Sequence, residues 1–210
     1  MTVMQQDQRT GPPVSGLIAE LTALAATGAL DALRVGAALP GLTARYGEPW
    51  DGGPVDGAAS GTHWFGWGSL QPVFCRCGLL ERLFIPVWHG ELELPVPGGG
   101  LRTVDSHVTE SVLTAALSAA GLSWRTVTYE NLSDQRTLEL KPAEDVWVSF
   151  VLTDRENYDD PPLQDWVLSK AGLWGIDHAR CPDAGSPDAD SPDADSRGAG
   201  SPDAGPVDGR

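Results

Sequence analysis

The stretch from residue 33 to residue 67, LRVGAALPGLTARYGEPWDGGPVDGAASGTHWFGW, contains the signals that decide the fold. Leu39, Leu42 and Tyr46 recur at three- and four-residue spacing, which predicts one buried stripe of a short helix. A glycine and then a proline follow this stripe, and both are typical of a helix end. The aromatic run HWFGW after the Gly-rich loop predicts the first strand of a sheet. The stretch therefore predicts a helix followed by a sheet, but it indicates no reaction.

The order of a helix followed by strands occurs twice along the chain, in a first unit at residues 15–97 and a second at residues 98–178. The glycine- and proline-rich run PVPGGG at residues 95–100 predicts the boundary between them. The expected helices cover residues 17–28, 39–46, 106–121 and, at the C-terminal end, 159–172. The expected strands cover residues 63–67, 70–77, 83–88, 89–94, 124–130, 135–141 and 145–152. Strands this close together leave no room for parallel crossovers, so we expect an α+β fold with antiparallel strands, the two units sharing or pairing their sheets.

Both ends of the chain have a different composition from its centre. Residues 1–14 are polar and contain Gly-Pro-Pro, which predicts a disordered leader. Residues 179–210 include the five-residue repeat CPDAG, SPDAD, SPDAD, SRGAG and SPDAG. This low-complexity repeat has no large apolar side chains that could form a core. We expect a disordered acidic tail there.

The formal net charge of the 210 residues is −15. Residues 179–210 contribute −4, from seven Asp against three Arg, which leaves −11 for the remainder. A surface of this sign repels phosphate backbones and suits a basic partner, so nucleic acid is not the expected ligand. No run of about 18 apolar residues predicts a membrane span, and the N-terminus does not resemble a secretory signal. Together with the odd number of cysteines, three, these features predict a cytoplasmic protein.

Four residues could form a metal or enzymatic site. His63, Cys75, Cys77 and His89 are spaced so that they could fall on neighbouring strands, and two thiolates with two imidazoles can bind zinc. The competing interpretation is two small buried thiols and two surface imidazoles, because the usual thiol pair is Cys-x₂-Cys on a turn. No phosphate-binding loop, dinucleotide fingerprint or nucleophile elbow occurs in the sequence, so we expect neither an enzyme nor a cofactor. A small-molecule enzyme or a zinc protein built on these four residues is the alternative.

Eight tryptophans in one chain favour a binding protein. Trp50, Trp64 and Trp67 flank the glycine-rich loop of the first unit, and aromatic side chains at such positions commonly anchor protein interfaces. The expected binding set adds acids that would attract a basic partner: Asp51, Asp56, Glu91 and Glu93.

The opening stretch also resembles a group of small bacterial binding domains. The resemblance rests on an apolar–glycine start, a helix that ends in Gly-x-Pro, and a sheet that opens on an aromatic residue, at Leu33–Gly36, Tyr46–Pro49, Trp67–Leu70 and Phe74. These domains include the outer-membrane-assembly lipoproteins and the tandem β-lactamase inhibitor protein. The chain looks closest to cytoplasmic relatives that are similar to immunity proteins of polymorphic toxin systems. The resemblance implies a non-catalytic domain that binds another protein. An immunity protein that neutralises a toxin is one form of such a domain.

Overall fold

The computed structural model describes residues 15–55, 61–154 and 165–175. The expected leader, the expected tail and Asp56 lie outside these residues. The helices are α1 (Ser15–Thr27), α2 (Leu39–Tyr46) and α3 (Glu110–Ala119). The strands are β1 (Ala29–Leu30), β2 (Leu33–Arg34), β3 (Trp50–Pro54), β4 (His63–Gly66), β5 (Gln71–Phe74), β6 (Leu80–Pro86), β7 (Glu91–Pro95), β8 (Leu101–Asp105), β9 (Arg125–Tyr129), β10 (Leu132–Ala143), β11 (Val146–Thr153) and β12 (Val167–Trp174).

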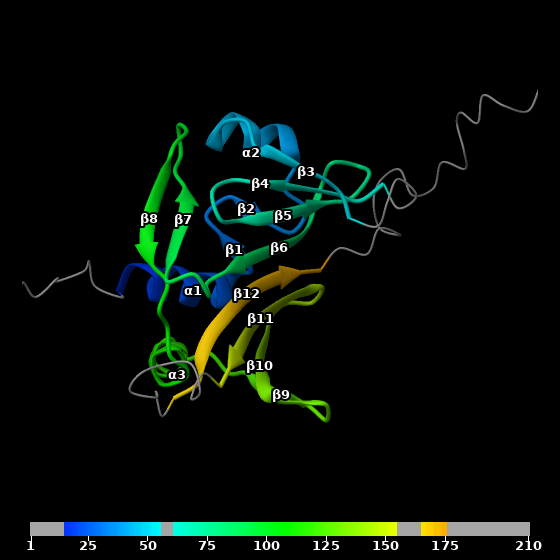
Figure 1. Ribbon diagram of the computed structural model, residues 1–210. Coiled ribbons are helices and arrows are strands. Elements are labelled where there is room, and N and C mark those ends of the chain that lie inside the picture. The colour runs from blue at the N-terminus through cyan, green and yellow to red at the C-terminus, as the bar shows by residue number, and fades with distance from the viewer. Residues whose placement is uncertain (1–14, 56–60, 155–164, 176–210) are drawn as a thin grey trace, which may run out of the picture.

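One antiparallel sheet of eight strands runs through the described chain, in the order β3-β4-β5-β6-β12-β11-β10-β9 (Figure 1). Its first four strands come from the first expected unit and its last four from the second. The pairing of β6 with β12 joins the two halves, with Ile85 opposite Ala171 and Leu83 opposite Leu173. The α+β fold with antiparallel strands is thereby confirmed, and the two units share one sheet.

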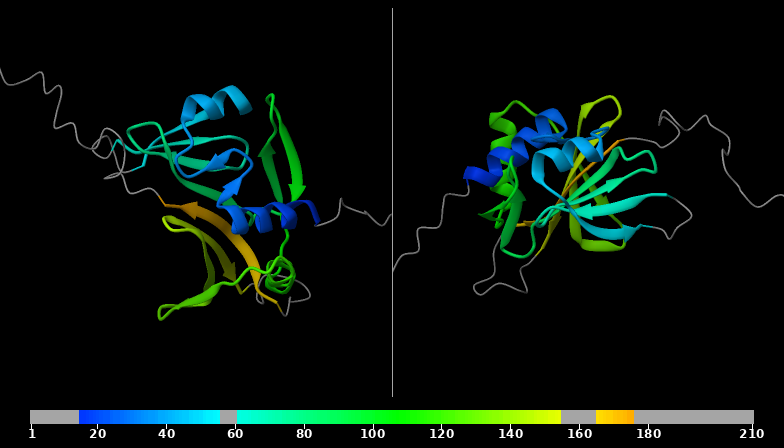
Figure 2. Two further views of the ribbon diagram at one scale, coloured as in Figure 1. Left: turned by 180° about the vertical axis from the view of Figure 1, so that it is seen from behind. Right: turned by 90° about the horizontal axis from the view of Figure 1, so that it is seen from above.

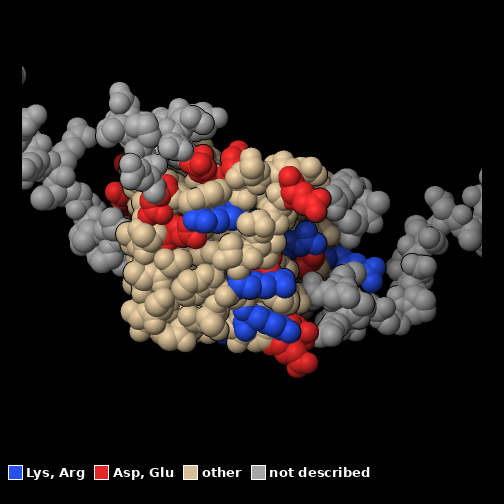
Figure 3. All heavy atoms as spheres, turned by 90° about the horizontal axis from the view of Figure 1, so that it is seen from below, with Lys and Arg blue, Asp and Glu red and all other residues tan. Residues whose placement is uncertain are grey.

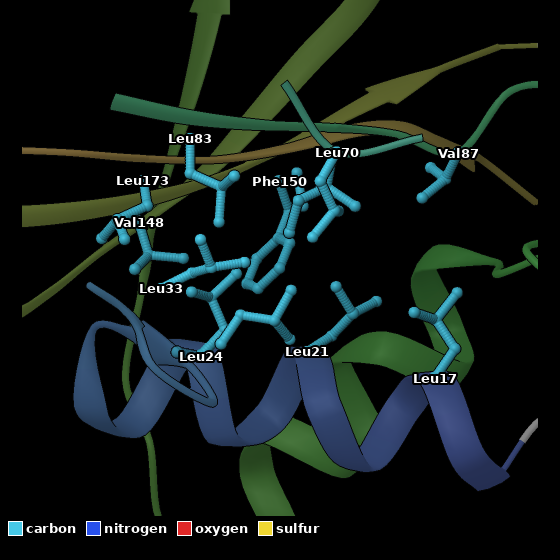
Figure 4. Close-up of a cluster of buried hydrophobic side chains, with 14 of the residues drawn as sticks. Leu17, Leu21, Leu24, Leu33, Leu70, Leu83, Val87, Val148, Phe150 and Leu173 are labelled. Atoms are coloured by element: carbon cyan, nitrogen blue, oxygen red, sulfur yellow. The ribbon is translucent and has the colours of Figure 1, made fainter. Parts of the chain in front are cut away.

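The three helices bury their apolar residues against one side of this sheet. Leu17, Leu21 and Leu24 give α1 a buried stripe at helical spacing, and each is at most 3% exposed. Figure 4 shows these side chains pointing towards Phe150 of β11 and its neighbours on the sheet. Leu42 and Tyr46 of α2 and Leu113 and Leu117 of α3 belong to the same buried cluster. In Figures 1 and 2, α1, α3 and the β7–β8 hairpin lie on the same side of the sheet.

The helix of the opening stretch folds as its pattern predicts, whereas the expected glycine-rich loop contains β3, which precedes the predicted strand in the sheet. Residues 39–46 form α2, and Leu42 and Tyr46 of the predicted stripe are buried. Gly47 follows with φ +85°, a conformation that a side chain would strain. Its backbone N–H donates to the carbonyl of Thr43, which ends the helix.

The boundary expected near residue 97 falls inside a hairpin loop. β7 and β8 pair with each other from Glu91 opposite Asp105 to Pro95 opposite Leu101, and the glycine run closes their turn. Gly98, Gly99 and Gly100 all have φ near +90°. The Gly98 N–H donates to the carbonyl of Arg45 at 2.8 Å, which ties the hairpin tip to α2. The run PVPGGG is therefore a turn between two strands, and Leu101–Asp105 is a strand that the sequence analysis did not predict.

The expected C-terminal helix at residues 159–172 is wrong for the part that the structure describes. Residues 167–174 form β12, which lies between β6 and β11 in the middle of the sheet. Val167, Leu168, Ala171 and Leu173 are all at most 3% exposed. The pairing of β12 with β11 is irregular between Val151 and Leu152, which breaks the strict alternation of the strand. The buried Val167, Leu168 and Ala171 therefore have the spacing of a helical stripe.

The segment that precedes β12 stabilises the start of α3. The Asp165 carboxylate accepts the Ser111 backbone N–H at 3.1 Å, and the Glu110 N–H donates to the Trp166 carbonyl at 2.8 Å. Thr109, the residue before α3, makes no side-chain cap of its own. The helix expected from residue 106 begins four residues later, at Glu110. The cap therefore comes from a segment 54 residues away along the chain.

Candidate functional site: the tryptophan face

The side of the sheet opposite the helices carries the candidate site, which we call the tryptophan face. We define it by its aromatic residues Trp50, Trp64, Phe84, Trp147 and Trp174 and its basic residues Arg82, Arg125, Lys141 and Lys170. Because side chains alternate along a strand, these residues point away from the core-facing leucines and valines of the same strands. In the described chain, the buried side chains of all three helices belong to the core on the other side.

One row of directly opposed residues crosses five neighbouring strands of this face. Trp64 lies opposite Val73, Val73 opposite Arg82, Arg82 opposite Trp174, and Trp174 opposite Trp147. Directly opposed side chains in an antiparallel pair lie about 4.5–5.5 Å apart at their Cβ atoms. The register thus brings together three tryptophans that are 83 and 27 residues apart in the sequence.

Two glycines make room for the aromatic end of the row. Trp50 lies opposite Gly66, and a Cβ added to Gly66 would lie 2.0 Å from the Trp50 ring. A Cβ added to Gly52 would lie 2.1 Å from the Trp64 ring. The two indoles therefore lie flat on glycine backbone, and they meet edge to face with 4.6 Å between ring centroids. Aromatic rings that cover glycine in neighbouring strands are a known way of compensating for the missing side chain.

Substituting Gly66 by alanine should displace the Trp50 indole. The added methyl group overlaps the ring, and Trp50 is 48% exposed, so the ring can rotate into solvent. We expect loss of the Trp50–Trp64 contact, a destabilisation of about 0.5–1.5 kcal/mol and a changed near-ultraviolet circular dichroism spectrum. Gly41→Ala is the matched control, because nothing lies within 4 Å of a Cβ there and alanine favours its helix. An unchanged aromatic spectrum in Gly66→Ala would contradict this packing.

Cations lie over the aromatic rings of the same face. The Lys141 ammonium and the Arg125 guanidinium are both 5.3 Å from the centre of a Trp147 ring, and the Lys170 ammonium is 5.4 Å from the Phe84 ring. Lys141 and Lys170 are the only lysines in the sequence. Arg125 is also paired with Glu139 at 2.6 Å and Arg82 with Glu81 at 3.0 Å, but none of the ion pairs within the described residues involves either lysine.

Two open grooves meet on this face at Phe84. The larger has a volume of about 660 Å³ and runs past Arg82, Lys141, Trp147 and Trp174, with Glu81, Glu144, Asp145 and Gly175 at its end. The smaller, of about 220 Å³, is lined by Pro54, Val55, Trp64, Gln71, Val73 and Phe84. Both are shallow and open to solvent, a shape that suits an extended segment of a partner better than an enclosed small molecule.

The tryptophan face is less acidic than the chain as a whole. Its strand residues include four basic side chains, Arg82, Arg125, Lys141 and Lys170, against two acids, Glu81 and Glu139, each of which is paired with one of the arginines. Figure 3 shows the surface of the molecule seen from below, where Lys and Arg side chains also lie beside Asp and Glu. The charges that sum to −15 are therefore unevenly distributed over the surface.

The structure separates the binding residues expected from the sequence. Trp50 and Trp64 belong to the tryptophan face, but Trp67 does not: it is 4% exposed and its indole N–H donates to the Gly47 carbonyl at 2.8 Å. Trp67 is a core residue, so its expected role as an exposed anchor is wrong. Asp51 is exposed but lies on the opposite side of β3, 2.5 Å from His63. Hydrogen bonds from His63 and then from the Gly53 N–H lower the pKa of Asp51.

The remaining expected acids lie away from the tryptophans or outside the described residues. Glu91 and Glu93 are exposed on β7, in the hairpin on the helix side of the sheet. The Glu93 backbone is tied to the β4–β5 turn, where its carbonyl accepts the Ser69 N–H and its own N–H donates to the Ser69 hydroxyl. Asp56 is not among the described residues. The expected combination of acids around tryptophans is therefore not found on one surface.

The four residues of the possible zinc site do not converge. Among the described residues, which include all four, no three His, Cys, Asp or Glu side chains are placed to hold one metal ion. Cys75 is buried and Cys77 half-buried in the turn after β5, and His63 is paired with Asp51. His89 is exposed and packs against Trp88 at 5.3 Å.

A separate polar cluster lies beside a cavity of about 290 Å³ between α1, α2 and the β7–β8 hairpin. Arg45 makes two hydrogen bonds to Asp31, at 2.8 and 2.9 Å, and the Tyr46 hydroxyl donates to the same carboxylate at 2.6 Å. Asp31 stands in the turn between β1 and β2 with φ +53°. The Arg45 hydrogen bond, and after it that of Tyr46, lowers the pKa of Asp31, while burial and Asp31 raise that of Tyr46. Since these groups satisfy one another, the cluster fastens α2 to the turn.

The substitution Asp31→Asn should destabilise the protein modestly, and only while Asp31 is ionised. Because the folded pKa is lowered, the ionised pair stabilises the fold above the unfolded pKa of about 3.9 and loses this effect as the pH falls through the folded value. Both partners are about half exposed, so we expect a difference of roughly 0.2–1 kcal/mol at pH 7. Asparagine tolerates positive φ as aspartate does, so the variant isolates the charge. Thermal melts at pH 7 and pH 3 check this, and an equal difference at both values would contradict it.

Of the residues that define the tryptophan face, the sequence indicated Trp50 and Trp64 as binding residues. Trp147 lies on a predicted strand, at residues 145–152, but was not in the expected binding set. Trp174 and Lys170 belong to the segment for which the sequence wrongly predicted a helix. Arg82, Lys141 and Phe84 carried no sequence signal, because only the strand register places them beside the tryptophans.

Within the described residues, no helix is both long enough and apolar enough to cross a membrane. Comparison of the chain with known protein families, with curated proteins and with solved structures gives no match.

Proposed function

We propose that this chain is a non-catalytic binding protein that holds a partner polypeptide against the tryptophan face. The observation that carries the proposal is the row Trp64–Val73–Arg82–Trp174–Trp147 across five adjacent strands on the side that the helices leave open. Tryptophan and arginine are the residues most enriched among those that dominate interface energies. The grooves on either side of Phe84 add a surface into which an extended partner segment fits.

The charges on the face indicate the chemistry of the partner. Two lysines lie over aromatic rings without an ion-pair partner in the described chain, and the two acids on the strands of the face, Glu81 and Glu139, are paired with arginines. We therefore propose a partner segment with a negative charge. A basic partner, which the overall acidity suggests, remains a prediction for the surfaces that carry Glu91 and Glu93, away from the tryptophans.

An aromatic, lysine-bearing sheet face can also bind single-stranded nucleic acid by base stacking. The net charge of −15 opposes this, because a phosphate backbone would have to approach an acidic molecule. A single-stranded oligonucleotide is therefore a useful control ligand, and we expect it not to bind at physiological salt.

Capture of partners from the lysate of the native cell, followed by purification and titration, tests the proposal. We expect one polypeptide to bind the wild type and Trp88→Ala but not Trp147→Ala. Trp88 is the control because it is 42% exposed and lines neither groove. Equal binding by all three proteins, or binding of the oligonucleotide through Trp147, would contradict the proposal.

Toxin neutralisation is one form of this function and rests on the resemblance described above. Co-expression with the product of an adjacent gene that encodes a toxin should restore growth, and Trp147→Ala should abolish the rescue. Growth arrest that persists with wild-type protein would rule out this form and leave the binding role open to the capture experiment.

A further inference from the structure

We propose that the chain's own C-terminal tail, residues 176–210, docks in the larger groove of the tryptophan face and competes there with the partner. This inference rests on the proposed function, since it names a regulation of the same surface. Three features carry it: the point at which the tail begins, its charge, and its proline repeat.

The residue that directly precedes the tail lines the groove. β12 ends at Trp174, and both Trp174 and the following Gly175 line the groove. Pro182, the first proline of the repeat, is seven residues further on. Seven extended residues span roughly 23–25 Å. Lys141 on β10 is only two strand spacings from β12, or about 10 Å, so the repeat can reach it with chain to spare.

The charges of tail and face are complementary. Residues 179–210 contain seven Asp and three Arg. The strand residues of the face have two more basic than acidic residues. Arg82 and Arg125 are paired with Glu81 and Glu139, whereas no ion pair of the described residues involves Lys141 or Lys170. Glu81, Glu144 and Asp145 lie at the end of the groove near Gly175, where the tail leaves the sheet. Beyond them lie Trp147, Lys141 and, past Phe84, Lys170. The carboxylates of the repeat would therefore meet the lysines after the chain has passed the acidic end.

The repeat also has the chemistry that aromatic grooves bind. Prolines recur every five residues at Pro182, Pro187 and Pro192, each followed by Asp. Proline-containing segments are extended before binding and lose little entropy when they dock on aromatic side chains. A tail attached at the groove has an effective concentration in the millimolar range, so even a weak contact is substantially populated.

The chain's two lysines make the test specific. A carbodiimide activates a carboxylate, which then forms an amide bond with an amine in contact with that carboxylate. Lys141 and Lys170 have the only side-chain amines in the sequence. We expect cross-links from these lysines to the tail aspartates in the full-length protein, identified by peptide mass spectrometry. A mixture of ¹⁴N- and ¹⁵N-labelled chains separates links within one chain from links between two. The control is a full-length variant in which the seven tail aspartates from Asp183 to Asp208 are replaced by asparagine.

The second readout is the reactivity of the two lysines with a limiting acetylating reagent. We expect both to react about threefold or more faster in the asparagine variant than in the wild type, and 1 M salt to remove the difference. Equal rates without tail cross-links would overturn the inference, and so would links only to Glu144 and Asp145 or only between isotopically different chains. The proposed function is tested separately: a partner lost in Trp147→Ala but bound equally by wild type and the asparagine variant would refute tail docking and leave the binding role intact.

Discussion

Substituting Trp147 by alanine should weaken binding of the partner by about thirtyfold or more. Trp147 lies on β11, between β12 and β10, opposite Trp174 and beneath two cations. Truncation of a buried interface tryptophan typically costs about 2 kcal/mol or more, which corresponds to this factor in the dissociation constant. Isothermal titration calorimetry with the purified partner measures the dissociation constant.

Two further variants separate a binding effect from a folding effect. Trp147→Phe keeps a ring beneath Arg125 and Lys141, so we expect it to retain more of the affinity than the alanine variant. Trp88→Ala, on an indole outside both grooves, should bind as the wild type does. A Trp147→Ala protein that melts as the wild type does and binds within threefold of it would remove Trp147 from the interface.

The substitution Phe150→Ala should destabilise the fold by about 3–5 kcal/mol. Phe150 is fully buried and points from β11 towards α1, where it lies among Leu21, Leu24 and Leu33 (Figure 4). Removing its ring leaves a cavity between the sheet and the helix, and small domains are stable by only about 5–15 kcal/mol in total. Urea unfolding measures the change in the free energy of unfolding.

Val112→Ala is the control for this prediction, because Val112 is 43% exposed on α3. We expect its free energy of unfolding to lie within about 0.5 kcal/mol of the wild type. A similar small loss in Phe150→Ala would show that the core shared by α1 and β11 is not what stabilises the sheet.

Local patterns predicted the elements whose two faces differ. α2 is recognisable from three apolar residues at helical spacing and the glycine that follows, and β11 from the alternation of Val148, Phe150 and Leu152 with other residues. In these segments only one face is buried, so apolar residues recur at the period of the helix or the strand.

The same reasoning fails where a strand is irregular or where its partner strand is distant. The sequence of β12 resembles a helix because the irregular pairing with β11 gives Val167, Leu168 and Ala171 helical spacing. The tryptophan face could not be predicted, since its central row depends on β12 pairing with both β6 and β11. Acids near tryptophans in the sequence, such as Asp51, point to the other side of the sheet, because neighbouring residues of a strand face opposite ways.

Protection of the two lysines by the bound partner tests the binding surface most directly. The measurement compares acetylation of Lys141 and Lys170 with and without saturating partner, in the full-length variant whose tail aspartates are replaced by asparagine. We expect both lysines to become several-fold less reactive, because both lie over rings of the tryptophan face. A partner that binds tightly while both lysines react as fast as in the free protein would show that the partner binds elsewhere.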